Sequence, residues 1–155
     1  MATKKEVKLT FAKSDVPKLI KKWTQANKSV DEVDVVNVIQ YLTPDQRIHF
    51  VNELFRVLKD DGKARLVIPH WAASKAYADL DVVWPPIVGG WFYFLDADWR
   101  KQNGQEKTKY KCNFTATWGW GLHPSISTRN QEYQQHAVTF WIEAAQDLAC
   151  TLVKK

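Results

Sequence analysis

Polar residues follow two apolar, β-branched segments of this sequence, at the positions where strands would end. Asn37, Gln40 and Tyr41 close the first segment, and His70 follows the second. In open α/β sheets, ligands bind at the carboxyl ends of the strands. One interpretation is a binding pocket with Asn37 and Gln40 at its floor and His70 as an acid or a base. The alternative is that these are ordinary strand-end side chains and that His70 is a hydrogen-bonded structural histidine.

Aromatic side chains are concentrated after His70. Trp71, Tyr77 and Trp84, with Asp79 among them, are candidates for contact with a substrate or a partner. Aromatic rings stack on nucleobases and line apolar pockets, but they also build cores and interfaces, so these alternatives stay open. The aromatic-rich segment is predicted to be an insertion at 72–109, with short helices at 73–79 and 90–100 and a polar loop at 103–109.

Metal-ligating residue types are present without a metal-ligand pattern. The spacings of His123, His136 and Cys112 match no such pattern, so no metal site is predicted. Cys112 and Cys150 are too few for a disulfide framework and are expected to be reduced thiols of a cytoplasmic protein. The first residues lack the apolar core of a secretory signal, and no apolar run reaches the about 18 residues that span a membrane.

The clearest local pattern is a strand, a helix and a second strand. Val33 to Ile39 is a β-branched run of the kind that is buried on both faces of a parallel sheet. Thr43 can cap a helix whose first residue is Pro44, and Gly62 is expected as its left-handed C-terminal cap. The helix has an apolar stripe at Ile48, Val51, Leu54, Phe55 and Leu58, and the second strand is expected at Ala64 to Ile68. Together they predict a right-handed βαβ unit.

Weaker patterns surround this unit. Ser14 can cap a short helix with Leu19, Ile20 and Trp23 on its apolar face. A long helix with Ala137, Phe140, Trp141 and Ala144 on one side is expected at 127–147. Further strands are predicted at 6–11, 110–120 and 148–153.

The net charge of +5 is concentrated near the N-terminus. Residues 1–28 hold eight lysines against two acidic residues, Glu6 and Asp15. Such a segment could meet nucleic acid or an acidic protein, or it could be a solvated face that keeps the protein soluble. The lysines are not interleaved with aromatic residues as in a nucleic-acid module, so nucleic acid is not expected as a partner.

The stretch from Val33 to Trp71 resembles the fourth strand, fourth helix and fifth strand of class I S-adenosylmethionine-dependent methyltransferases. The most specific string is Arg56-Val57-Leu58-Lys59, followed by Gly62. Further similarity lies in Pro69-His70-Trp71 and in Ala76-Tyr77-Ala78-Asp79 up to Trp84-Pro85-Pro86, and Arg129 to Gln135 is similar to bacterial and phage relatives. The resemblance covers roughly residues 29–155.

This resemblance implies an α/β fold, a shortened Rossmann-like three-layer sandwich with a mostly parallel sheet. It implies a single domain over 1–155, in which 1–28 is an atypical basic segment. It also implies S-adenosylmethionine as the cofactor, with Asn37, Gln40 and Tyr41 at the expected cofactor site and His70 as the candidate catalytic residue.

The sequence departs from the family where the cofactor binds. The family uses a glycine loop after its first strand, because glycine lets backbone amides approach the ligand. The first glycine of this chain is Gly62, and the usual Glu-His at the end of the fourth strand is Gln40-Tyr41. The pattern is that of an N-terminally shortened, degenerate relative, and it leaves open whether the protein is an enzyme.

Two functions are compatible with these observations. The first is a methyltransferase-like domain that still binds S-adenosylmethionine or a related nucleoside. The second is a non-catalytic protein that kept the fold and binds a protein partner. Loss of the first strands would expose an edge of the sheet, which 6–11 could cover in part. We therefore expect a homodimer formed through that edge or through the aromatic segment.

Overall fold

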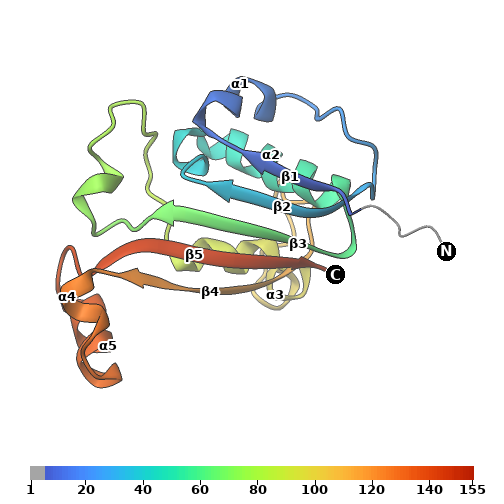
Figure 1. Ribbon diagram of the computed structural model, residues 1–155. Coiled ribbons are helices and arrows are strands. Elements are labelled where there is room, and N and C mark those ends of the chain that lie inside the picture. Colours follow the sequence, from blue (N-terminus) through green and yellow to red (C-terminus); the bar gives the residue numbers. More distant parts are fainter. Residues whose placement is uncertain (1–5) are drawn as a thin grey trace.

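A computed structural model describes residues 6–155 of the chain, which contain a five-stranded sheet (Figure 1). The strands are β1 (Lys8–Phe11), β2 (Val30–Val36), β3 (Leu58–Pro69), β4 (Phe114–Leu122) and β5 (Ala145–Lys154), in the order β1-β2-β3-β5-β4. β1 pairs with β2, and β2 with β3, in parallel, whereas β5 is antiparallel to both of its neighbours. The predicted α/β class and mostly parallel sheet are confirmed.

The predicted βαβ unit is β2, α2 (Pro44–Val57) and β3. Thr43 caps α2 as predicted: its hydroxyl accepts from the Gln46 N–H, and the Gln46 side chain accepts from the Thr43 N–H. The prediction of Gly62 as the helix cap is wrong. Leu58 is already extended after the last helical residue and pairs with Val30 of β2, so the chain passes directly from helix to strand. The left-handed residue in the following bulge is Asp61, with φ of 61°.

The N-terminal segment lies along β2 and then crosses α2. The strand predicted at 6–11 is present as β1. Ser14 does not cap a helix, because it lies inside the 3-10 turn η1 (Lys13–Asp15), and the following α1 (Val16–Leu19) is a single turn. Trp23 leaves the helix but is buried, since its ring packs on Phe11 and Phe50 with centroids 5.0 and 5.4 Å away.

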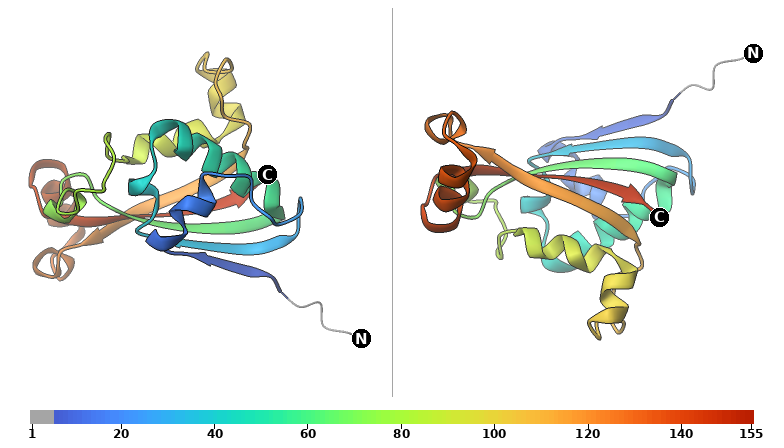
Figure 2. Two further views of the ribbon diagram at one scale, coloured as in Figure 1. Left: turned by 90° about the horizontal axis from the view of Figure 1, so that it is seen from above. Right: turned by 90° about the horizontal axis from the view of Figure 1, so that it is seen from below.

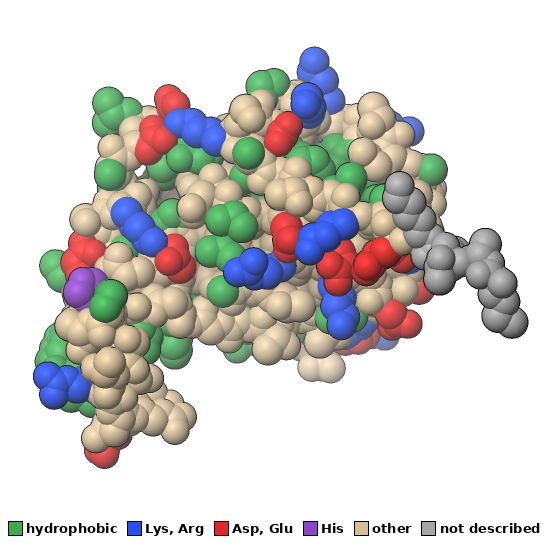
Figure 3. Space-filling view, in the orientation of Figure 1, with side chains coloured by type: hydrophobic (Ala, Val, Ile, Leu, Met, Phe, Trp, Pro, Cys, Tyr) green, Lys and Arg blue, Asp and Glu red, His purple; other side chains and the backbone are tan. Residues whose placement is uncertain are grey.

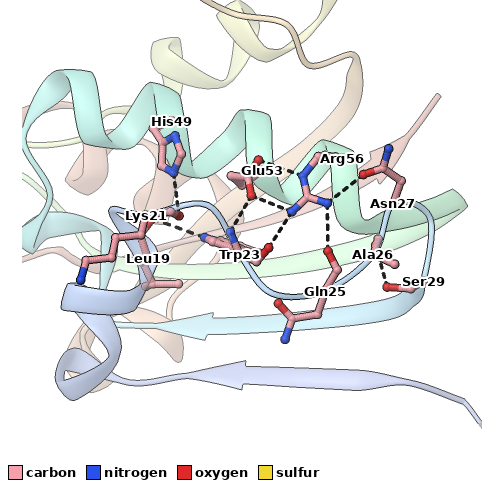
Figure 4. Close-up of polar contacts among 10 residues, drawn as sticks. All are labelled: Leu19, Lys21, Trp23, Gln25, Ala26, Asn27, Ser29, His49, Glu53 and Arg56. Carbon is pink, nitrogen blue, oxygen red and sulfur yellow. Dashed lines mark hydrogen bonds and ion pairs between the residues drawn. The ribbon is translucent and has the colours of Figure 1, made fainter.

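Polar contacts join the segment between α1 and β2 to α2 (Figure 4). The Glu53 carboxylate accepts from the Trp23 N–H at 2.8 Å and from the Arg56 guanidinium at 2.7 and 2.9 Å. Arg56 also donates to the Trp23 and Gln25 carbonyl oxygens and to the Asn27 side chain.

The aromatic segment forms short helices, as predicted, with different bounds. They are η3 (Ser74–Ala76), η4 (Gly89–Leu95) and α3 (Ala97–Gln102), the last capped by the Asp96 carboxylate. Residues 103–109 contain no helix or strand, in agreement with the predicted loop. The strands predicted at 110–120 and 148–153 are confirmed as β4 and β5 with shifted ends.

The single helix predicted at 127–147 is wrong. The segment contains the end of α4 (Pro124–Ser127), then α5 (Gln131–Phe140), and it joins β5 at Ala145. Asn130 caps α5, and Trp141 is extended. Glu143 is left-handed at φ 64°, which turns the chain into the sheet. Among the residues predicted on the apolar side of this helix, Ala137 is buried, whereas the Phe140 side chain is 70% exposed.

The helical segments α2, η4 and α3 lie on one face of the sheet, and α4 and α5 lie beyond its end (Figure 2). Val33, Val35 and Leu66 point toward these helices and are buried in the main core. The alternate positions are polar: Lys8, Asp34 and Arg65 lie on the opposite face, which Figure 3 shows as a mixture of acidic and basic side chains. The described residues thus form two layers where the resemblance implied three, because the second face carries charged and threonine side chains rather than apolar ones.

Candidate binding site at the carboxyl ends of the strands

Three loops meet at the carboxyl ends of β1, β2 and β3, and Lys13 lies between them. Lys13 follows β1, and its ammonium donates to Asp79 at 2.6 Å and lies 2.8 Å from a carboxylate oxygen of Asp81. It also lies over the Tyr41 ring, 4.4 Å from the centroid. The Tyr41 hydroxyl donates to the same Asp79 carboxylate at 2.9 Å. We call Lys13, Tyr41, Asp79 and Asp81 the strand-end cluster.

The strand-end cluster fixes the charges of its members. The Lys13 ammonium, with the Asp81 N–H and the Tyr41 hydroxyl, lowers the pKa of Asp79 to about 2. The bond to Asp79 raises the pKa of Lys13 in turn. Burial and the neighbouring Asp79 carboxylate raise the pKa of Tyr41. Near neutral pH Lys13 is therefore a cation, Asp79 a carboxylate and Tyr41 a protonated phenol.

Asn37 and Gln40 have different roles in the loop after β2. Asn37 is left-handed at φ 55°, a conformation that asparagine tolerates well, and its N–H donates to the Val67 carbonyl. Gln40 is 8% exposed, and its carbonyl Oε1 is buried without a hydrogen-bond partner among the described residues. The Gln40 main-chain carbonyl accepts from the Val83 N–H, which joins the loops after β2 and β3.

His70 is buried at the end of β3. Its Nδ1 accepts from the Ala72 N–H at 3.2 Å, and its main chain bonds Gln146 and Ala73. Burial lowers the pKa of His70, so the ring is neutral near pH 7. Because Nδ1 is the acceptor, the ring proton lies on Nε2. These contacts agree with the interpretation of His70 as a hydrogen-bonded structural histidine.

The aromatic candidates are exposed rather than directed into the cluster. Trp71 and Tyr77 are joined by a hydrogen bond from the Tyr77 hydroxyl to the Trp71 carbonyl at 2.8 Å. Trp84 is 74% exposed, and it precedes a cis peptide bond to Pro85. Their surfaces are open to a partner.

The fold brings together part of the predicted set and adds residues that sequence reasoning missed. Tyr41 and Asp79 are hydrogen bonded, whereas His70 makes hydrogen bonds with main-chain groups and lies beside the Trp71 ring, with the centroids 5.7 Å apart. Lys13 and Asp81 complete the cluster, but the sequence predicts Lys13 only as one of many basic residues. The signal that could have indicated it is its position directly after a strand, where a Rossmann-like sheet binds its ligand.

Charged groups elsewhere in the described residues form no metal centre. Over 6–155, no group of three or more His, Cys, Asp or Glu side chains is placed to hold a metal ion. Cys112 and Cys150 are free and buried. Within the same range, no helix has the length and apolar character needed to cross a membrane.

The basic N-terminal segment is largely paired within the chain. Of its lysines, Lys4 and Lys5 lie outside the described residues. Lys8, Lys13, Lys18 and Lys28 lie within ion-pair distance of carboxylates.

No protein-family model and no curated protein matches the sequence. The structure is similar to a SAM-dependent methyltransferase from Archaeoglobus fulgidus, with a TM-score of 0.57, 12% identity, and coverage of 90% of this chain and 64% of that one. It is also similar to a chain in a complex that contains the Haloferax volcanii Trm112 methyltransferase activator, with a TM-score of 0.50, 10% identity, and coverage of 88% and 58%. A third match is the small RNA methyltransferase HEN1, with a TM-score of 0.51, 10% identity, and coverage of 88% of this chain and 15% of that one.

These similarities show the fold: the chain has a class I methyltransferase-like fold, as its resemblance implied. It spans less than two thirds of each of these solved chains, at 64%, 58% and 15%. The strand order also agrees with a Rossmann-like sheet, in which the first strand lies beside the fourth. β1 takes that position beside β2.

The residues after β1 do not fit the cofactor in the way that the family's glycine loop does. The loop is Ala12-Lys13-Ser14-Asp15, and the Ala12 N–H is bonded to the Asp15 carboxylate at 2.9 Å. A glycine loop offers free amides to its ligand. Here the amide is engaged, and the Lys13 side chain extends over the strand ends instead.

Proposed function

We propose that this chain is a methyltransferase-like domain that binds a protein partner and does not transfer methyl groups. The observation that carries the proposal is the position of Lys13, whose ammonium joins Asp79 and Asp81 across the Tyr41 ring. In a Rossmann-like sheet the ligand binds at the carboxyl ends of the strands. A chain that fills this place with its own ion pairs has no need of a ligand there.

The partner is proposed to be a second copy of this chain, contacted through the aromatic segment or the outer edge of β1. Tyr77 and Trp84 of the aromatic segment, and Trp71 directly before it, are large and exposed aromatic residues. Exposed aromatic side chains of this kind are enriched in protein interfaces. β1 is a terminal strand of the sheet, with one free edge among the described residues. Light scattering that finds only monomer at tens of micromolar protein would refute the dimer.

A second candidate function is binding of S-adenosylmethionine or a related nucleoside at the same edge. Gln40 favours it, because a buried carbonyl without a partner is an acceptor that a ligand hydroxyl could satisfy. Binding at this edge would require Lys13 to leave Asp79, which would then become available as a second acceptor.

Calorimetric titration with S-adenosylmethionine and with S-adenosylhomocysteine separates the two functions. If the domain is non-catalytic, the wild-type protein gives no heat and no thermal shift at millimolar ligand. Lys13→Ala opens the cluster, and Lys18→Ala is a matched control, since among residues 6–155 Lys18 pairs with Asp15, three positions before it, and with no residue of the cluster. Micromolar binding by the wild type refutes the proposal, and binding by Lys13→Ala alone shows that Lys13 blocks a retained site.

His70→Ala gives an independent test. An enzyme that uses His70 as an acid or base loses turnover in this variant. A binding domain keeps its partner, because the His70 ring contacts the neighbouring Ala72 amide within the fold. Loss of partner binding at unchanged stability would contradict the structural role.

A further inference from the structure

A concave surface lies away from the strand-end cluster. It is a groove of about 690 Å³ between the first turns of α2, residues 85–88, η4 and the segment 108–110. Its walls are mainly apolar and aromatic, with Ile48, Ile87, Trp91, Phe94 and three prolines among them. Pockets that bind small molecules occupy roughly 300–1,000 Å³ and have such walls. None of the four strand-end cluster residues lines this groove.

The charged groups of the groove are already engaged. The buried Arg47 guanidinium donates to the main-chain carbonyls of Ile39, Val83 and Pro85. Lys109 pairs with the Asp45 carboxylate at 2.7 Å. The Arg47 guanidinium is therefore not available to neutralise an anionic ligand, and Lys109 lies in an ion pair that is 73% and 76% exposed. The mainly apolar walls favour an uncharged ligand.

Two hydroxyl groups of the groove retain an unused donor. Thr108 Oγ1 is buried and has no hydrogen-bond partner within residues 6–155. The Tyr110 hydroxyl accepts from the Trp91 indole N–H at 2.8 Å, so its own O–H remains free to donate. A buried hydroxyl without a partner costs free energy, which a ligand acceptor would recover.

We propose that this groove binds a neutral, largely apolar small molecule with a ring system and a carbonyl group. The ring would lie against Trp91 and Phe94. The carbonyl oxygen would accept from Tyr110, or from Thr108 after the Thr108 hydroxyl turns from its buried position toward the groove. Prolines in the wall and the two bonds of Arg47 to the loop at 83–85 hold the groove open in the absence of a ligand. The proposal does not depend on whether the strand-end cluster binds a cofactor.

Nile red is a suitable probe, because it is uncharged, aromatic and carries one carbonyl, and its fluorescence rises in apolar surroundings. Titration of the wild-type protein should give saturable binding at one site. Gly90 lines the groove, and a Cβ built there meets no atom within 4 Å, so Gly90→Leu adds an apolar side chain beside the groove without a clash at its Cβ. It should weaken binding by about tenfold or more.

Thr108→Val tests the hydroxyl at nearly constant shape. It should weaken Nile red binding by about five- to tenfold, the usual effect of one hydrogen bond. Thermal stability should stay the same or rise, because a buried unpartnered hydroxyl is removed. Thr117→Val, on the exposed face of β4, is the matched control and should leave binding unchanged.

Ile142→Ser controls for non-specific adsorption, since Ile142 lies in the exposed apolar turn after α5. The proposal is supported if binding is lost in Gly90→Leu, weakened in Thr108→Val and retained in Ile142→Ser. It is overturned if the wild type shows no saturable binding, if Gly90→Leu binds as the wild type does, or if Ile142→Ser removes the signal.

Discussion

Arg56 is expected to hold the N-terminal segment on the rest of the fold, and Arg56→Ala tests this role. The guanidinium donates to the Trp23 carbonyl at 3.1 Å, the Gln25 carbonyl at 2.9 Å and the Asn27 side chain at 2.8 Å (Figure 4). It also pairs with Glu53, whose carboxylate accepts from the Trp23 N–H. Arg56 thus binds the segment between α1 and β2 directly, and it also holds the Glu53 carboxylate that binds the same segment.

The expected magnitude follows from the partial burial of the pair. The side chains of Arg56 and Glu53 are 21% and 12% exposed. Breaking a fully buried pair by removing one partner costs about 3–5 kcal/mol, and an exposed pair is worth about 0–1 kcal/mol. Between these limits, we expect Arg56→Ala to lower the free energy of unfolding by about 2–3 kcal/mol. For a domain of this size, that is a fall in melting temperature of about 5–10 °C.

Urea unfolding followed by tryptophan fluorescence measures this change, with an unchanged m-value as the sign of a pure stability effect. Lys109→Ala is the control, because its pair with Asp45 is 73% and 76% exposed. It should change stability by less than about 0.5–1 kcal/mol. Arg56→Lys keeps the positive charge but loses the planar guanidinium group with its several donors. Its free energy of unfolding should therefore lie between those of the wild type and Arg56→Ala. A loss in Arg56→Ala no larger than in the control would refute the role of Arg56.

Three further predictions concern single residues. Thr43→Ala removes the N-terminal cap of α2 and should lower the free energy of unfolding by about 1 kcal/mol in urea. Gly62→Ala places a Cβ 2.8 Å from the Lys59 carbonyl oxygen, and the same assay should show a loss of about 1–3 kcal/mol. Asp79 should titrate near pH 2 in carboxyl NMR spectra, and this pKa should rise toward its ordinary value in Lys13→Ala. Because the folded pKa is the lower one, the stabilisation is present above pH 3.8 and is lost as the pH falls toward 2.

Local sequence signals predicted the central unit well. The Thr43 cap depends on neighbours within one turn and is present in the structure. The predicted apolar stripe is correct at Val51 and Leu54, but the buried face of α2 also holds Phe50 and Val57, and Leu58 belongs to β3. The same reasoning failed at 127–147, where an apolar spacing typical of a helix continues past the end of α5. There the pairing of β5 with β3 and β4 prevails over the local pattern, because the sheet buries Leu148 and Cys150 in the main core.

The candidate site was less predictable, because it depends on contacts between distant positions. Lys13 and Asp79 are 66 positions apart, and Tyr41 and Asp79 are 38 apart. A single sequence shows that each residue follows a strand, but it does not show that one lysine will reach two carboxylates. The short helices of the aromatic segment were predicted, but the groove that Ile48, Trp91 and Tyr110 line together was not.

The most specific string of the family resemblance builds the scaffold. In the string Arg56-Val57-Leu58-Lys59, Val57 and Leu58 are fully buried. Lys59 pairs with Asp31 at 2.6 Å, and Arg56 holds the segment before β2. Each of these contacts holds α2 and β3 in place, and none lies in the strand-end cluster. A chain can therefore keep this string because its fold requires it, whatever residues form the loop after β1, where Lys13 of this chain contacts Asp79.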